Sequence, residues 1–281
     1  MIHIERDLLV LVRGGGDLAS GVILRLHRVG FPVVVLELPQ PLAVRRAVSF
    51  AETVYEGTWT VEGVTARLVS PDQLQVALEA GLVPVLVDPA ASVLANAFVT
   101  SPRKTVVVDA RLTKQPPEPL PVRPLLHIGL GPGFRAGENC DAVVETRRSH
   151  TLGRVFWSGE PQPDSGQPEG DPRRVLRAPE EGVVRGVAQI GNIVEEGEVV
   201  AEIDNGLQTA DRQPSSVVRS PFRGVVRGLI HDGLNVAKGT KIGDVDPRGD
   251  PSACTLVSDK ALAVGGGVLE AVLSFGLRVE G

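Results

Sequence analysis

The chain is poor in cysteine, in aromatic residues and in long apolar runs, and each shortage excludes a class of protein. Its two cysteines, Cys140 and Cys254, are too few for a disulfide framework or a four-cysteine metal site. Aromatic residues make up 4% of the chain, which argues against a surface that stacks nucleic-acid bases. No apolar run reaches the ~18 residues of a membrane-spanning helix. We therefore expect no metal site, no nucleic acid and no membrane as a partner.

Positive charge is also not in excess. The chain has 29 Lys and Arg against 34 Asp and Glu, a net charge of −5, which favours neither nucleic acid nor an anionic membrane surface. The first residues, MIHIERD, carry charge too early for a signal peptide. With 281 residues, 42% of them hydrophobic, the chain has room for two domains. The expectation is a cytoplasmic protein with free thiols.

A glycine-rich stretch near the start is the most distinctive feature that is present. An apolar strand run leads into Gly14, Gly15 and Gly16, and a helical pattern begins at Asp17. With Ala19 in the last place, the spacing fits the dinucleotide fingerprint G-x-G-x-x-G/A. Free N–H groups at the start of a helix favour an anion, although the Asp17 carboxylate would compete for them. The stretch predicts a phosphate-binding turn, with a tight turn that binds no ligand as the alternative.

Short apolar strands alternate with helical segments through the first half of the chain, which is typical of a mostly parallel sheet. The second predicted strand ends at Glu37, where a dinucleotide-binding unit places the acid that binds a ribose hydroxyl; a solvated strand end is the alternative. A second glycine turn contains Gly131 and Gly133, and would meet the first at the carboxyl edge of the sheet. Asp88 and Asp109 end two other strands, and we predict that they form turns rather than bind a metal.

One segment concentrates reactive side chains. Cys140, Glu145 and His150 lie close together in the sequence, with Arg147 and Arg148 between them. A thiol with an adjacent base is a nucleophilic site, and nearby arginines would lower the pKa of the thiol. The alternative is a cysteine that packs as a small hydrophobic residue.

The second half of the chain contains an internal repeat. A Pro- and Gly-rich linker, residues 158–174, precedes it, and residues 177–204 return in register as residues 219–246. The repeated pattern P-x-x-G-V-V is similar to biotinyl/lipoyl carrier domains, so residues 175–250 are predicted to form a small barrel-sandwich. The stretch that joins the halves, residues 205–212, has no lysine, so we expect no biotin or lipoate and a docking or shielding role instead.

The last part of the chain, residues 251–281, is predicted to form a helix that packs back on the first domain, residues 1–157. The run Gly265–Gly267 lies inside this helix, where each glycine costs roughly 1 kcal/mol against alanine. The run therefore indicates close backbone contact or a break near a ligand. The expected fold class is α/β: a Rossmann-like, mostly parallel sheet domain with a small all-β barrel-sandwich inserted.

Several long motifs carry a family resemblance. They are VRGGGDLASGV, VVVLELPQPLAVRRAVSFAETVYEG, GLGPGFRAG, VVETRRSHTLGRV and SDKALAVGGGVLEAV. They resemble the selenium-dependent molybdenum hydroxylase accessory proteins of the YqeB type over nearly the whole chain. One departure is Ser149, where the family pattern has glycine. The resemblance implies a maturation role, with a molybdenum hydroxylase of the xanthine dehydrogenase kind as partner.

Three functions remain open from the sequence. The first is an accessory factor that holds a nucleotide or a molybdopterin-type cofactor: the two glycine turns would contact phosphate, Glu37 would orient a hydroxyl, and Cys140 would carry sulfur or selenium. The second is an NAD(P)-dependent oxidoreductase, and the third is a docking scaffold without a ligand. The identity of the cofactor and the formation of a homo-oligomer stay open.

Overall fold

The chain forms two compact units in the computed structural model, which describes residues 8–95, 104–166, 170–206 and 216–279. The first unit comprises Met1–Pro41, Phe50–Asp164 and Val257–Gly281. The second comprises Leu42–Ser49 and Ser165–Leu256. The end of the chain therefore returns to the first unit after the second unit is complete.

A nine-stranded sheet forms the centre of the first unit, in the order β3-β4-β5-β2-β1-β6-β7-β8-β9. Neighbouring strands from β4 to β8 are parallel, whereas β3 and β9 pair antiparallel at the two edges. The strands are β1 (Leu8–Arg13), β2 (Val33–Glu37), β3 (Thr58–Val61), β4 (Val64–Leu68), β5 (Val83–Val87), β6 (Lys104–Asp109), β7 (Leu126–Leu130), β8 (Ala142–Val144) and β9 (Val155–Phe156).

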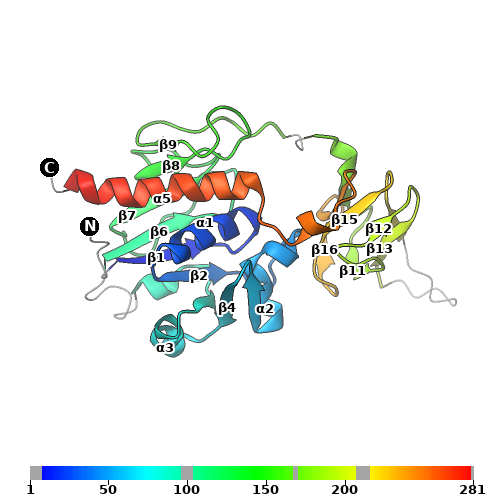
Figure 1. Ribbon diagram of the computed structural model, residues 1–281, viewed down its shortest axis with the longest axis horizontal. Helices are drawn as coiled ribbons and strands as arrows, with labels where there is room; N and C mark the ends of the chain where they lie inside the picture. The colour runs from blue at the N-terminus through cyan, green and yellow to red at the C-terminus, as the bar shows by residue number, and fades with distance from the viewer. Residues whose placement is uncertain (1–7, 96–103, 167–169, 207–215, 280–281) are drawn as a thin grey trace. The chain divides into compact units, whose positions relative to one another are not determined.

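Two long helices pack side by side in this unit, α1 (Asp17–Arg28) and α5 (Asp259–Val279) (Figure 1). Glycines let their backbones touch: a Cβ on Gly21 would overlap the carbonyl oxygen of Ala261, and one on Gly265 would overlap that of Gly21. A Cβ on Gly267 would overlap the carbonyl oxygen of Gly153. The close approach offsets the intrinsic cost of glycine in a helix. The glycine run is thus a packing surface.

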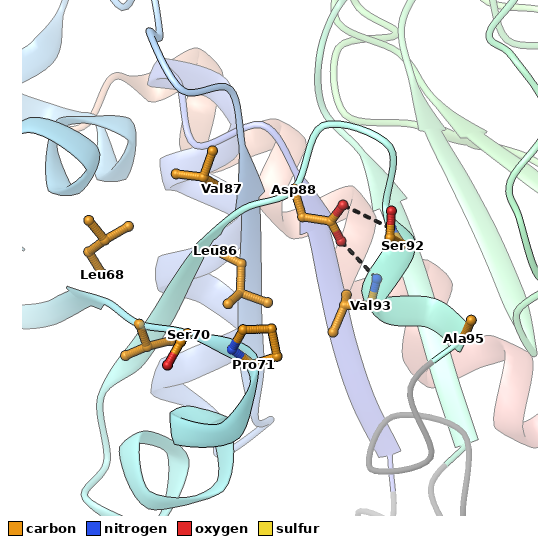
Figure 2. A pocket seen from close by; sticks show the side chains of 10 residues that line it. Leu68, Ser70, Pro71, Leu86, Val87, Asp88, Ser92, Val93 and Ala95 are labelled. Carbon is orange, nitrogen blue, oxygen red and sulfur yellow. Dashed lines mark hydrogen bonds between the residues drawn. The ribbon is translucent and has the colours of Figure 1, made fainter.

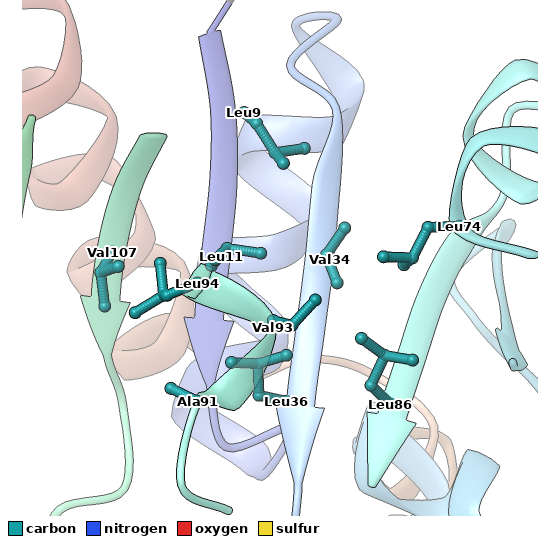
Figure 3. Packing of buried hydrophobic residues seen from close by; sticks show 10 residues of the cluster. All are labelled: Leu9, Leu11, Val34, Leu36, Leu74, Leu86, Ala91, Val93, Leu94 and Val107. Atoms are coloured by element: carbon teal, nitrogen blue, oxygen red, sulfur yellow. The ribbon is translucent and has the colours of Figure 1, made fainter. Parts of the chain in front are cut away.

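The opposite face of the sheet carries a hydrophobic cluster, covered by short elements (Figure 3). These short elements are α3 (Leu74–Glu79) and the 3-10 turn Ser92–Ala95. The unit has one further short helix, α2 (Thr53–Glu56), which follows the 3-10 turn Phe50–Glu52. All members of the cluster are buried: Leu9, Leu11, Val34, Leu36, Leu74, Leu86, Ala91, Val93, Leu94 and Val107. Among the described helices, none is long and apolar enough to cross a bilayer.

The second unit consists of two four-stranded antiparallel sheets, ordered β10-β17-β15-β12 and β14-β13-β11-β16. The two copies of the sequence repeat exchange strands, since β12 pairs with β15 and β16 pairs with β11. The strands are β10 (Val175–Arg177), β11 (Gly182–Gly186), β12 (Ile193–Val194), β13 (Val199–Asp204), β14 (Ser216–Arg219), β15 (Gly224–Leu229), β16 (Asn235–Val236) and β17 (Lys241–Asp246). Most of the stretch that joins the halves lies outside the described residues.

The predicted fold class, a Rossmann-like sheet domain with a biotinyl/lipoyl-like barrel-sandwich, is wrong. The large sheet is mixed, with an antiparallel strand at each edge, and the second unit is built from two separate antiparallel sheets. The prediction missed the β3–β4 hairpin, whose turn residues Glu62 and Gly63 both have positive φ. The alternation of strands and helices reports local structure only, so it does not reveal an edge hairpin.

Neighbouring glycines of α5 give a matched test of the helix contact. Gly265→Ala places a methyl group against the Gly21 carbonyl and should lower the free energy of unfolding by about 1–3 kcal/mol, as overpacking does. Gly266→Ala adds a methyl group in open space and should raise it by about 1 kcal/mol. Urea unfolding measures both, and equal changes in the two variants would show that the helices do not touch at Gly265.

Candidate functional site

The chain builds the parallel part of the sheet outward in both directions from β1, so the strand order has a switch point between β1 and β6. From β1 the sheet continues through β2 and β5 on one side, and through β6, β7 and β8 on the other. In open sheets with parallel strands, ligands bind outside the carboxyl ends of the strands at such a switch point, because the loops there diverge. The side chains at the ends of β1 and β6 therefore lie where such a sheet binds a ligand.

A network of ion pairs with a buried centre, Arg13 and Asp109, occupies this position. Arg13 ends β1, and its guanidinium donates to Asp109 Oδ2 at 3.1 Å, to the Pro89 carbonyl oxygen at 3.1 Å and to Glu118 Oε1 at 2.8 Å. Arg111 donates to Asp109 Oδ2 at 2.7 Å and to Glu118 Oε1 at 2.5 Å. The Asp109 side chain is fully buried and that of Arg13 is 3% exposed. Two guanidinium groups thus share two carboxylates, and the four charges balance.

Glu118 lies on a proline-rich segment, residues 112–124, that we call the strap. Non-glycine residues at its start, Leu112 and Lys114, adopt left-handed φ angles of 56° and 61°. Leu120 packs against the hydrophobic cluster. The hydrogen bond from Arg111 is the main cause that lowers the pKa of Glu118 from 4.5 to about 2. The strap is therefore anchored by Glu118 and Leu120, together with the ion pairs Lys114–Asp164 at 2.8 Å and Arg123–Asp141 at 3.3 Å.

The first glycine turn is hydrogen-bonded within the protein. Gly15 N donates to Glu37 Oε2 at 2.6 Å, and Leu38 N donates to Glu37 Oε1 at 2.8 Å. Burial raises the pKa of Glu37 despite these two bonds. A Cβ on Gly15 would lie 2.8 Å from the backbone nitrogen of Ala51, whereas Gly16 has open space around it. Gly15 and Glu37 therefore bind each other, which leaves Glu37 engaged with backbone rather than free to meet a ribose hydroxyl.

The remaining glycines of the predicted cofactor site lie against neighbouring residues. Gly14 has a φ of 90° and lies against Ala110 and Arg111, and Asp17 is half-buried in the first turn of α1. Gly131 and Gly133 also have positive φ. A Cβ on Gly131 would overlap Thr146 Oγ1, and one on Gly133 would overlap the carbonyl oxygen of Gln115 in the strap. The second turn needs glycine for close packing.

The structure does not bring Cys140, Glu145 and His150 together. Burial raises the pKa of the Cys140 thiol to about 12. The Glu145 carboxylate is fully buried and accepts hydrogen bonds from the backbone N–H groups of Arg147 and Gln162, at 2.7 and 2.8 Å. His150 is exposed, and within the described residues no hydrogen bond or ion pair joins the three. The raised pKa keeps the Cys140 side chain mostly in its thiol form at neutral pH. Glu145 accepts hydrogen bonds that fix the neighbouring backbone, so its carboxylate is not a base for the thiol.

A pocket of about 700 Å³ lies at the carboxyl ends of β4 and β5 (Figure 2). Its Asp88 carboxylate accepts hydrogen bonds from Ser92 N at 2.9 Å and Val93 N at 2.8 Å. The turn role predicted for Asp88 is confirmed, whereas Asp109 is the centre of the ion pairs. The lining residues are mainly apolar: Leu68, Val69, Ser70, Pro71, Leu86, Val87, Asp88, Ser92, Val93 and Ala95.

Sequence reasoning missed Arg13, Arg111 and Glu118. Arg13 ends an otherwise apolar run, LLVLVR, and a charged residue that continues a buried strand needs an opposite charge. That signal points to Asp109, which ends another strand. No signal pointed to Glu118, because proline-rich segments are ordinarily read as loops.

Both thiols should be inert in the folded protein. Burial is the largest cause that raises the pKa of Cys140 and of Cys254, and the thiolate is the form that reacts. Titration with 5,5′-dithiobis(2-nitrobenzoate) at pH 8 should find no fast thiol in the native protein and two after unfolding in guanidinium chloride. One fast equivalent in the native protein would restore the hypothesis of a reactive Cys140.

Glu118 should make the stability of the first unit sensitive to acid. Because its pKa is lowered from 4.5 to about 2, its contribution is complete above pH 4.5 and is lost as the pH falls toward 2. The wild type should therefore be more stable than Glu118→Gln at pH 6, and the difference should narrow between pH 4.5 and 2. Denaturant unfolding at a series of pH values measures this, and a difference independent of pH would exclude the ion pairs of Glu118 as its cause.

Comparison with known proteins gives one strong match in sequence. No family model matches the chain. The chain is 46% identical over 276 residues to "Uncharacterized protein YqeB" of Escherichia coli (strain K12). The alignment covers 96% of this chain and 48% of that protein, so the chain spans about half the length of its relative.

Similarity to solved structures is weak. A succinylglutamate desuccinylase/aspartoacylase of Rhodobacter sphaeroides is 21% identical, with a TM-score of 0.24 and coverage of 32% of this chain and 29% of that one. The ectoine utilization protein EutE (DoeB) of Ruegeria pomeroyi is 14% identical, with a TM-score of 0.26 and coverages of 85% and 57%. An aspartoacylase family protein of Mesorhizobium loti is 10% identical, with a TM-score of 0.27 and coverages of 86% and 85%. TM-scores this low transfer neither a fold nor an activity to this chain.

The geometry of the site corrects the predicted function. Gly15 N and Glu37, on which the predicted cofactor site depends, are hydrogen-bonded to each other at 2.6 Å, and burial raises the pKa of the Cys140 thiol to about 12. The prediction of a selenium and molybdenum accessory factor that handles a nucleotide or pterin-type cofactor is therefore wrong, and its two alternatives are not retained. The resemblance in sequence to the YqeB type is confirmed, since 96% of the chain aligns with YqeB at 46% identity.

Proposed function

We propose that the first unit binds a small, predominantly apolar molecule in the pocket between β4, β5 and the 3-10 turn Ser92–Ala95. The observation that carries the proposal is the pocket itself. Its volume of about 700 Å³ lies within the roughly 300–1,000 Å³ of small-molecule sites. Apolar side chains predominate in its lining, with Ser70, Asp88 and Ser92 as the polar exceptions.

The position of the pocket supports a binding role. Leu86 and Val93 form part of its wall and also belong to the hydrophobic cluster of the unit. Figure 2 shows Leu86 on β5 and Val93 on the 3-10 turn. An apolar ligand would complete this cluster and remove apolar surface from water, which is favourable at about 25 cal/mol per Å².

The pocket is also formed in advance of binding. The Asp88 carboxylate accepts two backbone N–H groups of the 3-10 turn, and the N–H of Asp88 itself donates to the Glu37 carbonyl oxygen at 3.1 Å. These bonds fix the turn against the end of β2. A ligand therefore meets an ordered wall, which reduces the entropy lost on binding.

A large side chain at the rim of the pocket should weaken ligand binding without destabilising the fold. Ala95 is exposed and lines the pocket, whereas Ala80 is exposed and is not among the lining residues. With 1-anilinonaphthalene-8-sulfonate as a fluorescent probe, Ala95→Trp should weaken binding at least tenfold, while Ala80→Trp should bind as the wild type does. All three proteins should share one melting temperature. Equal affinity of Ala95→Trp and the wild type would reject the pocket as the site.

A further inference from the structure

The contacts of Glu118 differ in kind from those of Asp109, although both carboxylates neutralise Arg13 and Arg111. Asp109 is fully buried at the end of β6, whereas the side chain of Glu118 is 58% exposed and reaches the arginines from the strap. Both arginines donate to the same oxygen, Glu118 Oε1. One carboxylate is thus part of the sheet, and the other is supplied from outside it.

Removing Glu118 would leave Arg13 and Arg111 with incomplete neutralisation. Arg13 would keep Asp109 and the Pro89 carbonyl oxygen, and Arg111 would keep Asp109. Two positive charges would then face one negative charge at a position where the Arg13 side chain is 3% exposed. A buried guanidinium without a full set of partners favours any anion that can reach it.

The surroundings of the two arginines would allow another anion to replace Glu118. Glu118 reaches the arginines from the solvent side, with its side chain 58% exposed, so a dissolved carboxylate can approach the same position and compete with it. The arginines lie where the strand order reverses, the usual position of ligands in open sheets.

We propose that Arg13 and Arg111 form a binding site for the carboxylate of a small organic acid, and that Glu118 occupies this site as an internal stand-in. The ligand carboxylate takes the place of Glu118 Oε1, and the strap is released from the sheet edge. This site is separate from the apolar pocket, so it does not depend on the proposed function. No bond is made or broken in the exchange, and one anion replaces another.

Acetate is the probe for the test, titrated against the full chain at pH 7 with chloride adjusted to hold the ionic strength constant. Glu118→Gln removes the competing charge and keeps the shape of the side chain, so acetate should bind at least tenfold more tightly than to the wild type by calorimetry. Glu138→Gln is the matched control, because Glu138 is an exposed glutamate paired with Arg135 and lies outside the strap. Its affinity for acetate should equal that of the wild type.

A second substitution shows where the acetate binds. Arg111→Gln in the Glu118→Gln background should abolish the gain, and circular dichroism checks that both variants are folded. The proposal is overturned if Glu118→Gln binds acetate no more tightly than the wild type, if the gain survives the loss of Arg111, or if inorganic phosphate binds and acetate does not.

Release of the strap can be measured separately from acetate binding, by limited proteolysis. Lys114 lies in the strap and pairs with Asp164 at 2.8 Å. Limited digestion with trypsin should cut after Lys114 faster in Glu118→Gln than in Glu138→Gln, and acetate should accelerate the cut in the wild type. Binding of acetate without faster cleavage would overturn the displacement of the strap.

Discussion

The ion pair between Arg13 and Asp109 is the interaction on which the carboxyl edge of the sheet depends. It joins the ends of the two central strands, β1 and β6, with both side chains withdrawn from water. Such a pair is stabilising only when its remaining donors and acceptors find partners, and here they reach Pro89 after β5 and Arg111 after β6. One pair of charges therefore fixes the loops that follow β5 and β6, and the loss of either partner would leave an uncompensated charge in the sheet.

The two candidate sites share this support but differ in chemistry. The apolar pocket extends from the hydrophobic cluster, and Asp88, which fixes its wall, directly precedes the Pro89 carbonyl that binds Arg13. The arginine site is polar and is covered by a carboxylate of the chain itself. Both lie at carboxyl ends of parallel strands, where loops diverge and backbone groups are left to be satisfied. The glycine turns support the same edge through close packing.

The strands and helices could be predicted from the sequence, whereas the hydrogen-bond partners of the polar side chains could not. The strand ends at Glu37, Val87 and Asp109 and the helix around the glycine run are confirmed. The fingerprint at Gly14–Gly16 suggested a phosphate, because spacing does not reveal that Gly15 N already donates to Glu37. Likewise the proximity of Cys140 and Glu145 in sequence says nothing of burial, which raises the pKa of the thiol. Hydrogen-bond partners that are distant in sequence, such as Glu118 for Arg13, leave no local pattern.

The position of α5 along the chain has a consequence for synthesis. The helix follows the whole second unit in sequence, yet it supplies the glycine surface against which α1 packs. Since synthesis on the ribosome runs from the N-terminus, the face of α1 that meets α5 stays exposed until the second unit has been made. The two copies of the repeat exchange strands, so the second unit is also incomplete until both have emerged. The inserted unit is then the first to finish, and the unit that begins the chain is the last.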